Sequence, residues 1–491
     1  MTDCQHQPLA QTPHLAPALT AMILGIVVPV VFGFYARSLE YRSITALAAD
    51  EAMIERDGKL APVKNQGTAL QQAALETDCL LPIYGSSELV LHAAYNRPFH
   101  ATNLFRDQPT GFTVFPVGKA QTTCLIILQK LAAIGPTLEG RKVAVSLSHA
   151  WFSDRVMAWA DGYAGNFSPL HAGELAFNTR LSLQLRQDAA RRMLQYPETL
   201  ANRPLLRFAL ENMADGSPLS LACYEAVLPL GIVHNAILRN ADHWKVVYYL
   251  WKHPMRTSSP ISPRSGQPLD WPKLHRQADA LYRAHSNNNE FGLDNEQWDR
   301  KLRQELVRQK NIRSKESFLR TLQINQEWVD LELLLRELTE LGARPLLLSM
   351  PLHGGWYDQL GITYAARSAY YQKLRETGAR YHTPVVDFAD HDADQSFCHD
   401  NMGHLAPSGL VYYSQVLDGF FHDKIPRQPE LPAPAPVSSR GTGAGLPSRL
   451  APGSRPPPSE RFHEPSAATA IEDRASWTNP EPTLQGRKGK P

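Results

Sequence analysis

The chain of 491 residues lacks several features that would place it in a common class of protein. It has no clear charge excess, because 50 basic residues stand against 48 acidic ones and leave a formal net charge of +2. Nucleic-acid-binding proteins usually carry a basic excess or stripe, so we expect no nucleic-acid partner. The five cysteines include no C-x-x-C pair, so nothing supports a zinc ribbon or a thioredoxin-like site.

The first 14 residues lack lysine and arginine altogether. Residues 15–36 follow as 22 positions without a charged side chain. At about 1.5 Å per residue, such a run can cross the roughly 30 Å hydrocarbon core of a bilayer. A cleaved signal peptide needs the basic start that is missing here, and a buried core helix is the other alternative. We expect a short tail at 1–14 and a transmembrane anchor at 15–36. Arg37 and Arg42 weakly favour the cytoplasm for the side after the anchor.

Short apolar runs recur along the chain, with helical patterns between or after them. The apolar runs are residues 80–84, 112–117, 142–148, 344–350 and 383–388. The helical patterns are residues 122–134, 326–341, 364–376 and 408–421. Strands that alternate with helices predict an α/β fold, in which helices cover both faces of a parallel sheet. The stretch 155–325 has mainly helical and polar patterns, so we expect a long helical insertion there.

The proline excess is concentrated at the C-terminus. The last 66 residues hold 14 of the 38 prolines and have no apolar periodicity. Such a segment cannot bury enough apolar surface to offset the entropy of ordering the chain. We therefore predict a membrane-proximal linker at 37–77, one catalytic domain at 78–425 that includes the insertion, and a disordered tail at 426–491.

A serine-containing turn, Gly85-Ser-Ser-Glu88, follows the first apolar run. A serine at the carboxyl end of a parallel strand stands where the next helix directs its positive end, and there it can act as a nucleophile. The same serine can also be a plain helix cap. The candidate base is His404, in a loop before the last helix. In a doubly wound sheet that loop returns to the same edge as the serine turn.

Further segments accompany the serine turn and the late histidine. In chain order, the set is Ile83-Tyr-Gly-Ser-Ser-Glu-Leu89, Ala150-Trp-Phe152, Asp330-Leu-Glu-Leu-Leu334, Ser349-Met-Pro351, Gly355-Trp-Tyr-Asp358, Gly361-Ile362, and His404 with Gly409 and Val411-Tyr412. Together these segments resemble the DltD family, whose members act in the D-alanylation of teichoic acids. The resemblance implies an SGNH-hydrolase-like (flavodoxin-like) three-layer fold with a parallel sheet and a helical insertion, preceded by one N-terminal transmembrane helix. It also implies that the domain lies outside the cytoplasm, which overrules the weak charge argument.

The resemblance implies roles for individual residues. Ser87 matches the nucleophile of the family and His404 its catalytic histidine. The family has an aspartate three residues before that histidine, whereas this chain has Asn401 there and Asp400 one residue earlier. Asn401 can orient an imidazole but cannot stabilise its cation as a carboxylate does. Asp400 can take the role if the loop is shifted by one residue; otherwise the site is a Ser–His dyad.

Further residues are expected to form the oxyanion hole or the pocket. They are Gly85, Ser86, Gly118, Trp151, Phe152, Trp356, Tyr357 and Asp358. Family members are often glycine-rich after the second strand, whereas this chain has Gly118-Lys-Ala-Gln-Thr122. The acidic and histidine residues between Asp387 and His404 fit no regular zinc spacing and are read as a solvated loop, so we expect no metal and no cofactor.

The resemblance predicts a membrane-anchored enzyme with a serine nucleophile. It would transfer a D-alanyl ester to a hydroxyl of teichoic acid or a related cell-envelope polymer. The implied partners are a membrane-bound O-acyltransferase of the MBOAT type and a D-alanyl carrier protein. Two alternatives stay open: an SGNH-type esterase or thioesterase, and a non-catalytic membrane scaffold that recruits the carrier protein.

Overall fold

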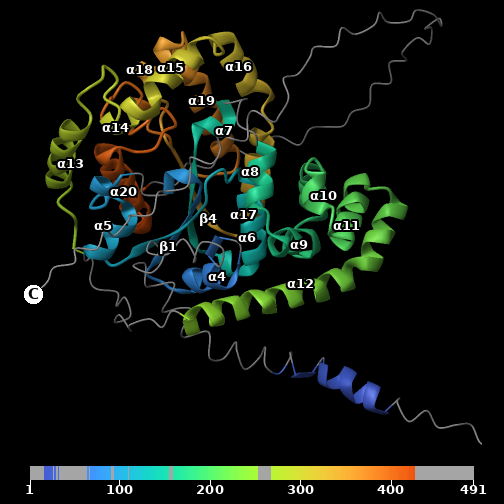
Figure 1. The fold of residues 1–491 in the computed structure, drawn as a ribbon. Helices are drawn as coiled ribbons and strands as arrows, with labels where there is room; N and C mark the ends of the chain where they lie inside the picture. Colours follow the sequence, from blue (N-terminus) through green and yellow to red (C-terminus); the bar gives the residue numbers. More distant parts are fainter. Residues whose placement is uncertain are drawn as a thin grey trace, which may run out of the picture. The chain divides into compact units, whose positions relative to one another are not determined.

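The computed structural model describes residues 16–25, 27–28, 31, 64–65, 67–89, 93–108, 110–153, 159–252 and 267–425. A five-stranded sheet lies at its centre (Figure 1). Its strands are β1 (Leu80–Gly85), β2 (Thr113–Gly118), β3 (Lys142–Leu147), β4 (Arg344–Ser349) and β5 (Val385–Val386). All neighbours pair in parallel, in the order β2-β1-β3-β4-β5. The predicted α/β fold with a parallel sheet is confirmed.

Alternate strand residues face opposite sides of the sheet. Tyr84 and Leu347 belong to one hydrophobic core, and their neighbours Ile83 and Leu348 belong to the other. The first core is completed by α4 (Ala69–Glu76), α6 (Cys124–Ile134), α17 (Glu327–Glu340) and α19 (Tyr364–Arg380). The second is completed by α5 (Ala101–Asp107), α13 (Trp271–His285) and α20 (Pro407–Phe421). Helices therefore cover both faces, and the loops that follow the strands meet at the carboxyl edge.

Between β3 and β4 the described elements are all helical. They are α7 (His149–Ser153), α8 (Trp159–Asn166), α9 (Pro169–Phe177), α10 (Leu183–Met193), η4 (Pro197–Leu200), α11 (Pro204–Asp215), α12 (Pro218–Lys252), α13, α14 (Asn295–Gln297), the π-helical η5 (Trp298–Leu302), α15 (Arg303–Lys310), α16 (Lys315–Ile324) and α17. The expected polar character is wrong for α12, which carries a long apolar stretch. Short elements elsewhere are η1 (Ser87–Leu89), η2 (Ala94–Asn96), η3 (Gly135–Leu138), α18 (Gly354–Gln359) and η6 (Ala389–His391).

The predicted anchor at 15–36 lies only partly within the described residues. Ala16–Gly25 forms a short apolar helix, whereas residues 15, 26, 29–30 and 32–36 lie outside the description. Within the described part, one helix is long and apolar enough to cross a membrane, by length and composition alone: Pro218–Tyr249 in α12. Most of the predicted linker, residues 37–63, and the predicted disordered tail at 426–491 also lie outside the described residues.

Helix α12 fixes the start of α4 through one buried carboxylate. Oδ2 of Asp242 accepts hydrogen bonds from the backbone N–H of Thr68 (2.8 Å) and of Ala69 (3.0 Å). The hydroxyl of Thr68 also donates to this oxygen, at 3.3 Å. The Thr68 side chain forms no cap of its own. Asp242 thus acts as a distant N-cap, and its negative charge faces the positive end of the α4 dipole.

We predict that Asp242→Ala lowers the free energy of unfolding by about 1–2 kcal/mol, because the first N–H groups of α4 lose their buried acceptor. Equilibrium urea unfolding of the full chain measures this change. The matched control is Glu225→Ala, which removes an exposed carboxylate from the same helix and should change the value by less than about 0.5 kcal/mol. Equal losses in the two variants would contradict the capping role.

Candidate active site

The serine turn directly follows β1 and depends on two glycines. Gly85 at the end of β1 is paired with Gly118 at the end of β2. A Cβ on Gly118 would stand 2.9 Å from the carbonyl oxygen of Ser86, and a Cβ on Gly85 would collide with the Glu88 carboxylate. Gly118 therefore needs to be glycine because the backbone of the serine turn approaches it closely, whereas Gly85 leaves room for the side chains of Glu88 and Leu89. This packing holds Ser87 at the carboxyl edge of the sheet.

Ser87 and His404 are 317 residues apart in the chain, yet their side chains meet. Ser87 Oγ lies 2.9 Å from Nε2 of His404. On the other side of the ring, Nδ1 lies 2.6 Å from Oδ2 of Asp400. A carboxylate can only accept, so Nδ1 carries the proton and Nε2 presents its lone pair to the serine hydroxyl. The three side chains have the arrangement of a nucleophile, a base and the group that orients the base.

Asp400 occupies the position for which the sequence left two candidates. Its Oδ1 also accepts hydrogen bonds from the backbone N–H of Met402 (2.9 Å) and of His404 (3.3 Å). The carboxylate therefore sets the loop backbone and the imidazole ring together. Asn401 is buried beside it. Of the two neighbouring candidates, Asp400 contacts the histidine through its carboxylate.

The surroundings of His404 favour its charged form. Burial opposes the imidazolium, but the Asp400 carboxylate attracts it and accepts its Nδ1 hydrogen bond. Glu88 adds a second attraction, whereas Lys301 in η5 acts in the opposite direction. The net effect is a pKa of His404 above its ordinary value. An imidazole with this pKa is a stronger base than a free one.

The loop that carries Asp400 and His404 is closed by its own backbone. The N–H of His399 donates to the carbonyl oxygen of His404 at 2.6 Å, and Cys398 and Leu405 form an antiparallel bridge. Gly403 has a φ of +86°, which glycine adopts without strain. A Cβ there would stand 3.1 Å from Nε2 of His149. The loop is thus packed tightly against the chain that follows β3.

His149 is a residue that the sequence reasoning missed. It is the first residue of α7, lies beside Gly403, and its Nδ1 is 3.4 Å from Oη of Tyr357. Burial lowers its pKa to about 3, so it is neutral at physiological pH. The sequence feature that could have identified His149 as a site residue is its position immediately after the third apolar run. Of the three residues expected from the Trp356-Tyr-Asp358 segment, Tyr357 is the one whose side chain contacts His149.

The other residues expected at the pocket after the third and fourth strands make their contacts with residues outside the triad. The Phe152 ring packs on Trp328 and Tyr370 in the first core. The carbonyl oxygens of Trp151 and Phe152 accept from Asn325. In the later segment, the Trp356 indole donates to Gln309 at 3.0 Å, and the exposed carboxylate of Asp358 pairs with Arg367 at 2.6 Å. These contacts stabilise the fold behind the site.

A second polar cluster holds the triad loop from the side of the insertion. Oη of Tyr95 donates to Asp294 at 2.5 Å and lies 3.3 Å from Nδ1 of His399. The Tyr95 ring stacks on His285 with 3.9 Å between the ring centres. The N–H of Asp294 donates to the carbonyl oxygen of His399, the residue before Asp400. No sequence motif indicated Tyr95 or Asp294, because they join segments about 200 residues apart.

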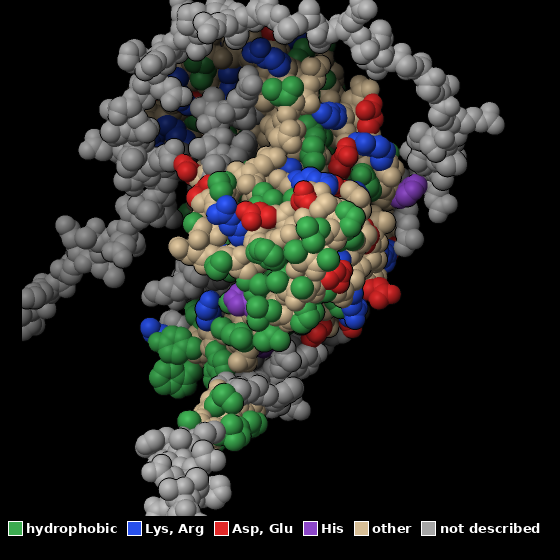
Figure 2. Space-filling model, turned by 90° about the vertical axis from the view of Figure 1, so that its right-hand side faces the viewer, with side chains coloured by type: hydrophobic (Ala, Val, Ile, Leu, Met, Phe, Trp, Pro, Cys, Tyr) green, Lys and Arg blue, Asp and Glu red, His purple; other side chains and the backbone are tan. Residues whose placement is uncertain are grey.

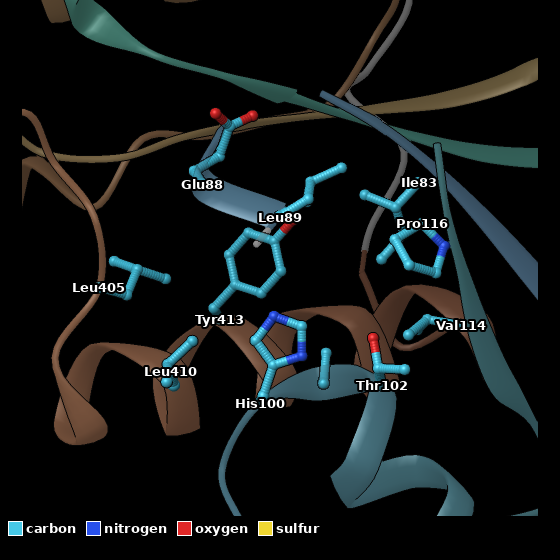
Figure 3. Close-up of a pocket in the computed structure, with 11 residues that line it drawn as sticks. Ile83, Glu88, Leu89, His100, Thr102, Val114, Pro116, Leu405, Leu410 and Tyr413 are labelled. Atoms are coloured by element: carbon cyan, nitrogen blue, oxygen red, sulfur yellow. The ribbon is translucent and has the colours of Figure 1, made fainter. Parts of the chain in front are cut away.

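Figure 3 shows a small hollow beneath the serine turn. Glu88 and Leu89 border it from η1, and His100, Leu410 and Tyr413 from the other side. At about 20 Å³ it has room for a water molecule but not for an acyl chain. Glu88 accepts the N–H of Ser86 at 2.7 Å, and burial raises the pKa of this carboxyl. The Ser86 N–H is therefore engaged inside the turn, and an oxyanion needs other donors at this edge.

The acidic residues before His404 do not form a metal site. Among the described residues, no group of three or more histidine, cysteine, aspartate or glutamate side chains could hold a metal ion. Asp392 instead forms a buried ion pair with Arg367, and Asp387 pairs with Arg375. The expectation of a solvated loop is wrong for Asp392, because its carboxylate is buried.

Comparisons with known proteins agree on one family. The family model described as "DltD protein" matches residues 58–422. The chain is 29% identical to "Protein DltD" of Bacillus subtilis (strain 168) over 378 residues, which cover 77% of this chain and 91% of that protein. It is 25% identical to "Protein DltD" of Staphylococcus aureus (strain NCTC 8325 / PS 47) over 393 residues, covering 79% and 93%. The match of the family model over most of the chain, on a fold that brings Ser87 to His404, shows that this chain belongs to the DltD family.

Proposed function

We propose that the chain is an acyl ester transferase that places D-alanyl groups on teichoic acid or a related cell-envelope polymer. The observation that carries the proposal is the unbroken series of hydrogen bonds from Ser87 through His404 to Asp400. Membership of the DltD family supports the choice of D-alanine as the acyl group. The site also lies at the carboxyl ends of the neighbouring strands β1 and β3. The chain adds β2 on one side of β1 and the later strands on the other, and doubly wound folds bind their ligands at such a switch point.

In the first half of the reaction, Ser87 Oγ attacks the carbonyl carbon of an activated D-alanyl ester or thioester. Nε2 of His404 takes the serine proton as the bond forms, and Asp400 stabilises the resulting imidazolium. The tetrahedral intermediate collapses, the leaving group receives the proton from His404, and an alanyl ester of Ser87 remains. In the second half, a polymer hydroxyl gives its proton to Nε2 of His404 and attacks the carbonyl carbon of this ester. The bond to Ser87 Oγ then breaks, and His404 returns the proton to Ser87 Oγ.

The wider proposal concerns fold, place and partners. The catalytic domain has an SGNH-hydrolase-like fold, and residues 15–36 anchor it with the domain outside the cytoplasm. A membrane-bound O-acyltransferase of the MBOAT type and a D-alanyl carrier protein supply the activated alanyl group. The triad needs no metal or cofactor for the steps above, because its own side chains move the proton.

Ester hydrolysis is the second candidate function. The His404 side chain is 14% exposed, so water can reach the base. Incubating the full chain with a D-alanyl ester, with and without a polyol acceptor, separates transfer from hydrolysis by the products formed. A scaffold without catalysis is less well supported, because it would not need the aligned triad.

We predict that Ser87→Ala abolishes ester-linked D-alanine in cells that carry the pathway, because the acyl group then has no nucleophile. Alkaline release of alanine from the envelope measures this. Serine-directed fluorophosphonate labelling of the purified chain should disappear as well. Ser368→Ala on α19 is the matched control and should keep both signals. Unchanged ester-linked alanine in the Ser87 variant would reject the proposal.

We predict unequal effects for the two neighbouring residues of the loop. Asp400→Asn should lower kcat by roughly 10²–10⁴-fold, because the amide no longer holds the imidazole in the tautomer that activates Ser87. Asn401→Ala should cost far less, since Asp400 already occupies Nδ1. Steady-state hydrolysis of a soluble D-alanyl ester gives both values. The reverse order of effects would assign the supporting role to Asn401.

The pH profile of kcat/KM should follow His404, which accepts a proton only when neutral. Its raised pKa places the acid limb above the ordinary histidine value, and activity falls as the pH drops through that limb. Asp400→Asn removes the main attraction for the imidazolium, so the limb should move to lower pH. His149 is neutral throughout, and the limb should stay in place in His149→Gln. A limb that does not move in the Asp400 variant would exclude His404 as the titrating base.

A further inference from the structure

The 35-residue helix α12 exposes large apolar side chains, unlike a helix on an ordinary water-facing surface, although its buried side also holds the apolar Tyr224, Val246 and Tyr249. Several positions turned toward the domain carry polar groups, among them the buried Asn235 and Asp242. The exposed positions carry large apolar side chains instead. They include Leu219, Leu230, Ile232, Val233, Ile237, Trp244, Tyr248 and Trp251. Leu219 and Trp251 are each 76% exposed.

The inner side of α12 is fixed to the domain along most of its length. Gly231 packs against the ring of Phe177, where a larger residue would collide. Arg239 forms an ion pair with Glu174 of α9, and Asp242 caps α4. Helix α12 also contacts α11 and α4, and Figure 1 shows it running past α11, α9 and α4. A helix held in this way cannot cross a bilayer without taking these elements with it.

The outer side of α12 is uncharged over a long stretch. Between Glu225 and Lys245, the exposed positions include no Asp, Glu, Lys or Arg. Figure 2 shows the side of the molecule on which α10, α11 and α12 lie, with many hydrophobic side chains gathered in its lower half. A largely apolar face without acidic, lysine or arginine side chains marks an interaction surface rather than an ordinary water-facing one.

The C-terminal end of the helix has the residues that favour the boundary between lipid and water. Trp244, Tyr248 and Trp251 are exposed there, together with Lys245 and Lys252. Tryptophan and tyrosine concentrate at the level of lipid headgroups, and lysine is attracted to anionic ones. A partner protein would not require this grouping of aromatic and basic side chains at one end.

The part of the domain that comes soonest after the predicted anchor in the sequence lies against α12. Twenty-seven residues separate the end of the predicted anchor at Ala36 from Lys64. The described chain resumes at Lys64 and is bound at Thr68 and Ala69 by Asp242 of α12. The first described residues of the domain thus lie against this helix.

We propose that the exposed face of α12 lies in the interfacial layer of a bilayer with anionic headgroups, parallel to the membrane plane. The apolar side chains from Leu230 to Ile237 enter the boundary of the acyl chains. Trp244, Tyr248 and Trp251 lie at the headgroup level, and Lys245 and Lys252 contact the anionic headgroups. The domain is then held at the membrane by a surface, in addition to any N-terminal tether, which limits the orientations it can take.

The test uses the full chain with the photoreactive residue p-benzoylphenylalanine at position 237, reconstituted into vesicles of phosphatidylglycerol and phosphatidylcholine. Irradiation should add the mass of one phospholipid. The matched control has the same residue at Tyr364, which is 54% exposed on α19, and should give no lipid adduct. Position 233 serves as a second probe on the same face and guards against a local folding defect at position 237.

Each other result overturns the proposal. A covalent dimer at position 237 would assign the face to a second copy of the chain. If neither position 233 nor position 237 gives an adduct, the exposed face of α12 does not contact the bilayer. Equal lipid yields at 237 and 364 would mean a random encounter. In the 237 probe, Val233→Glu should abolish the lipid adduct, while an unchanged circular dichroism spectrum verifies the fold; a retained adduct would contradict burial of this face in lipid.

Discussion

The hydrogen bonds of the Asp400 carboxylate are the interaction on which the site depends. One oxygen accepts Nδ1 of His404, and the other accepts the backbone N–H groups of Met402 and His404. A single side chain therefore sets the shape of the loop, the direction of the imidazole and its tautomer. The contact between His404 and Ser87 follows from these three, because Nε2 can meet the serine only when the ring is held in this plane.

The long insertion supports this loop as well as extending the domain. Asp294 bonds to the backbone of His399 and to the hydroxyl of Tyr95, so a segment of the insertion and a segment after β1 meet beside Asp400. On the opposite side, Gly403 lies against His149 at the start of α7. The loop is held between two parts of the chain that belong to different regions of the sequence. Rigid support of this kind keeps the contacts from Asp400 through His404 to Ser87 at short distances.

Much of the sheet was predictable because buried parallel strands are short apolar runs. Each of the five predicted runs overlaps a strand, although β5 covers only two residues of its run. The neighbourhood of Ser87 and His404 was predictable from chain order, since parallel strands end at one edge. The choice between Asp400 and Asn401 was not, because it depends on the turn taken by a few backbone atoms. The aromatic segments were also ambiguous: Tyr357 faces His149, but the adjacent Trp356 bonds to Gln309. Sequence spacing does not say which neighbour points inward.

The long insertion, too, could be predicted only in part from the sequence. The sequence pattern of residues 155–325 indicates helices, and the structure has them, but the outward face of α12 is apolar. The average composition of the helix does not reveal this face, because buried polar residues such as Asp242 and exposed apolar residues such as Ile237 offset each other in the average. Only the direction of each side chain separates a core helix from a helix with an outward-facing apolar surface.

The separation of 317 residues between Ser87 and His404 has a consequence for the synthesis of the protein on the ribosome. A ribosome adds roughly 5–20 residues per second, so the histidine is made between about 16 and 63 s after the serine. During that interval the serine is an ordinary, unactivated alcohol. The Ser87–His404 contact therefore cannot form until the loop before α20 has been made, and any shorter nascent chain lacks this contact.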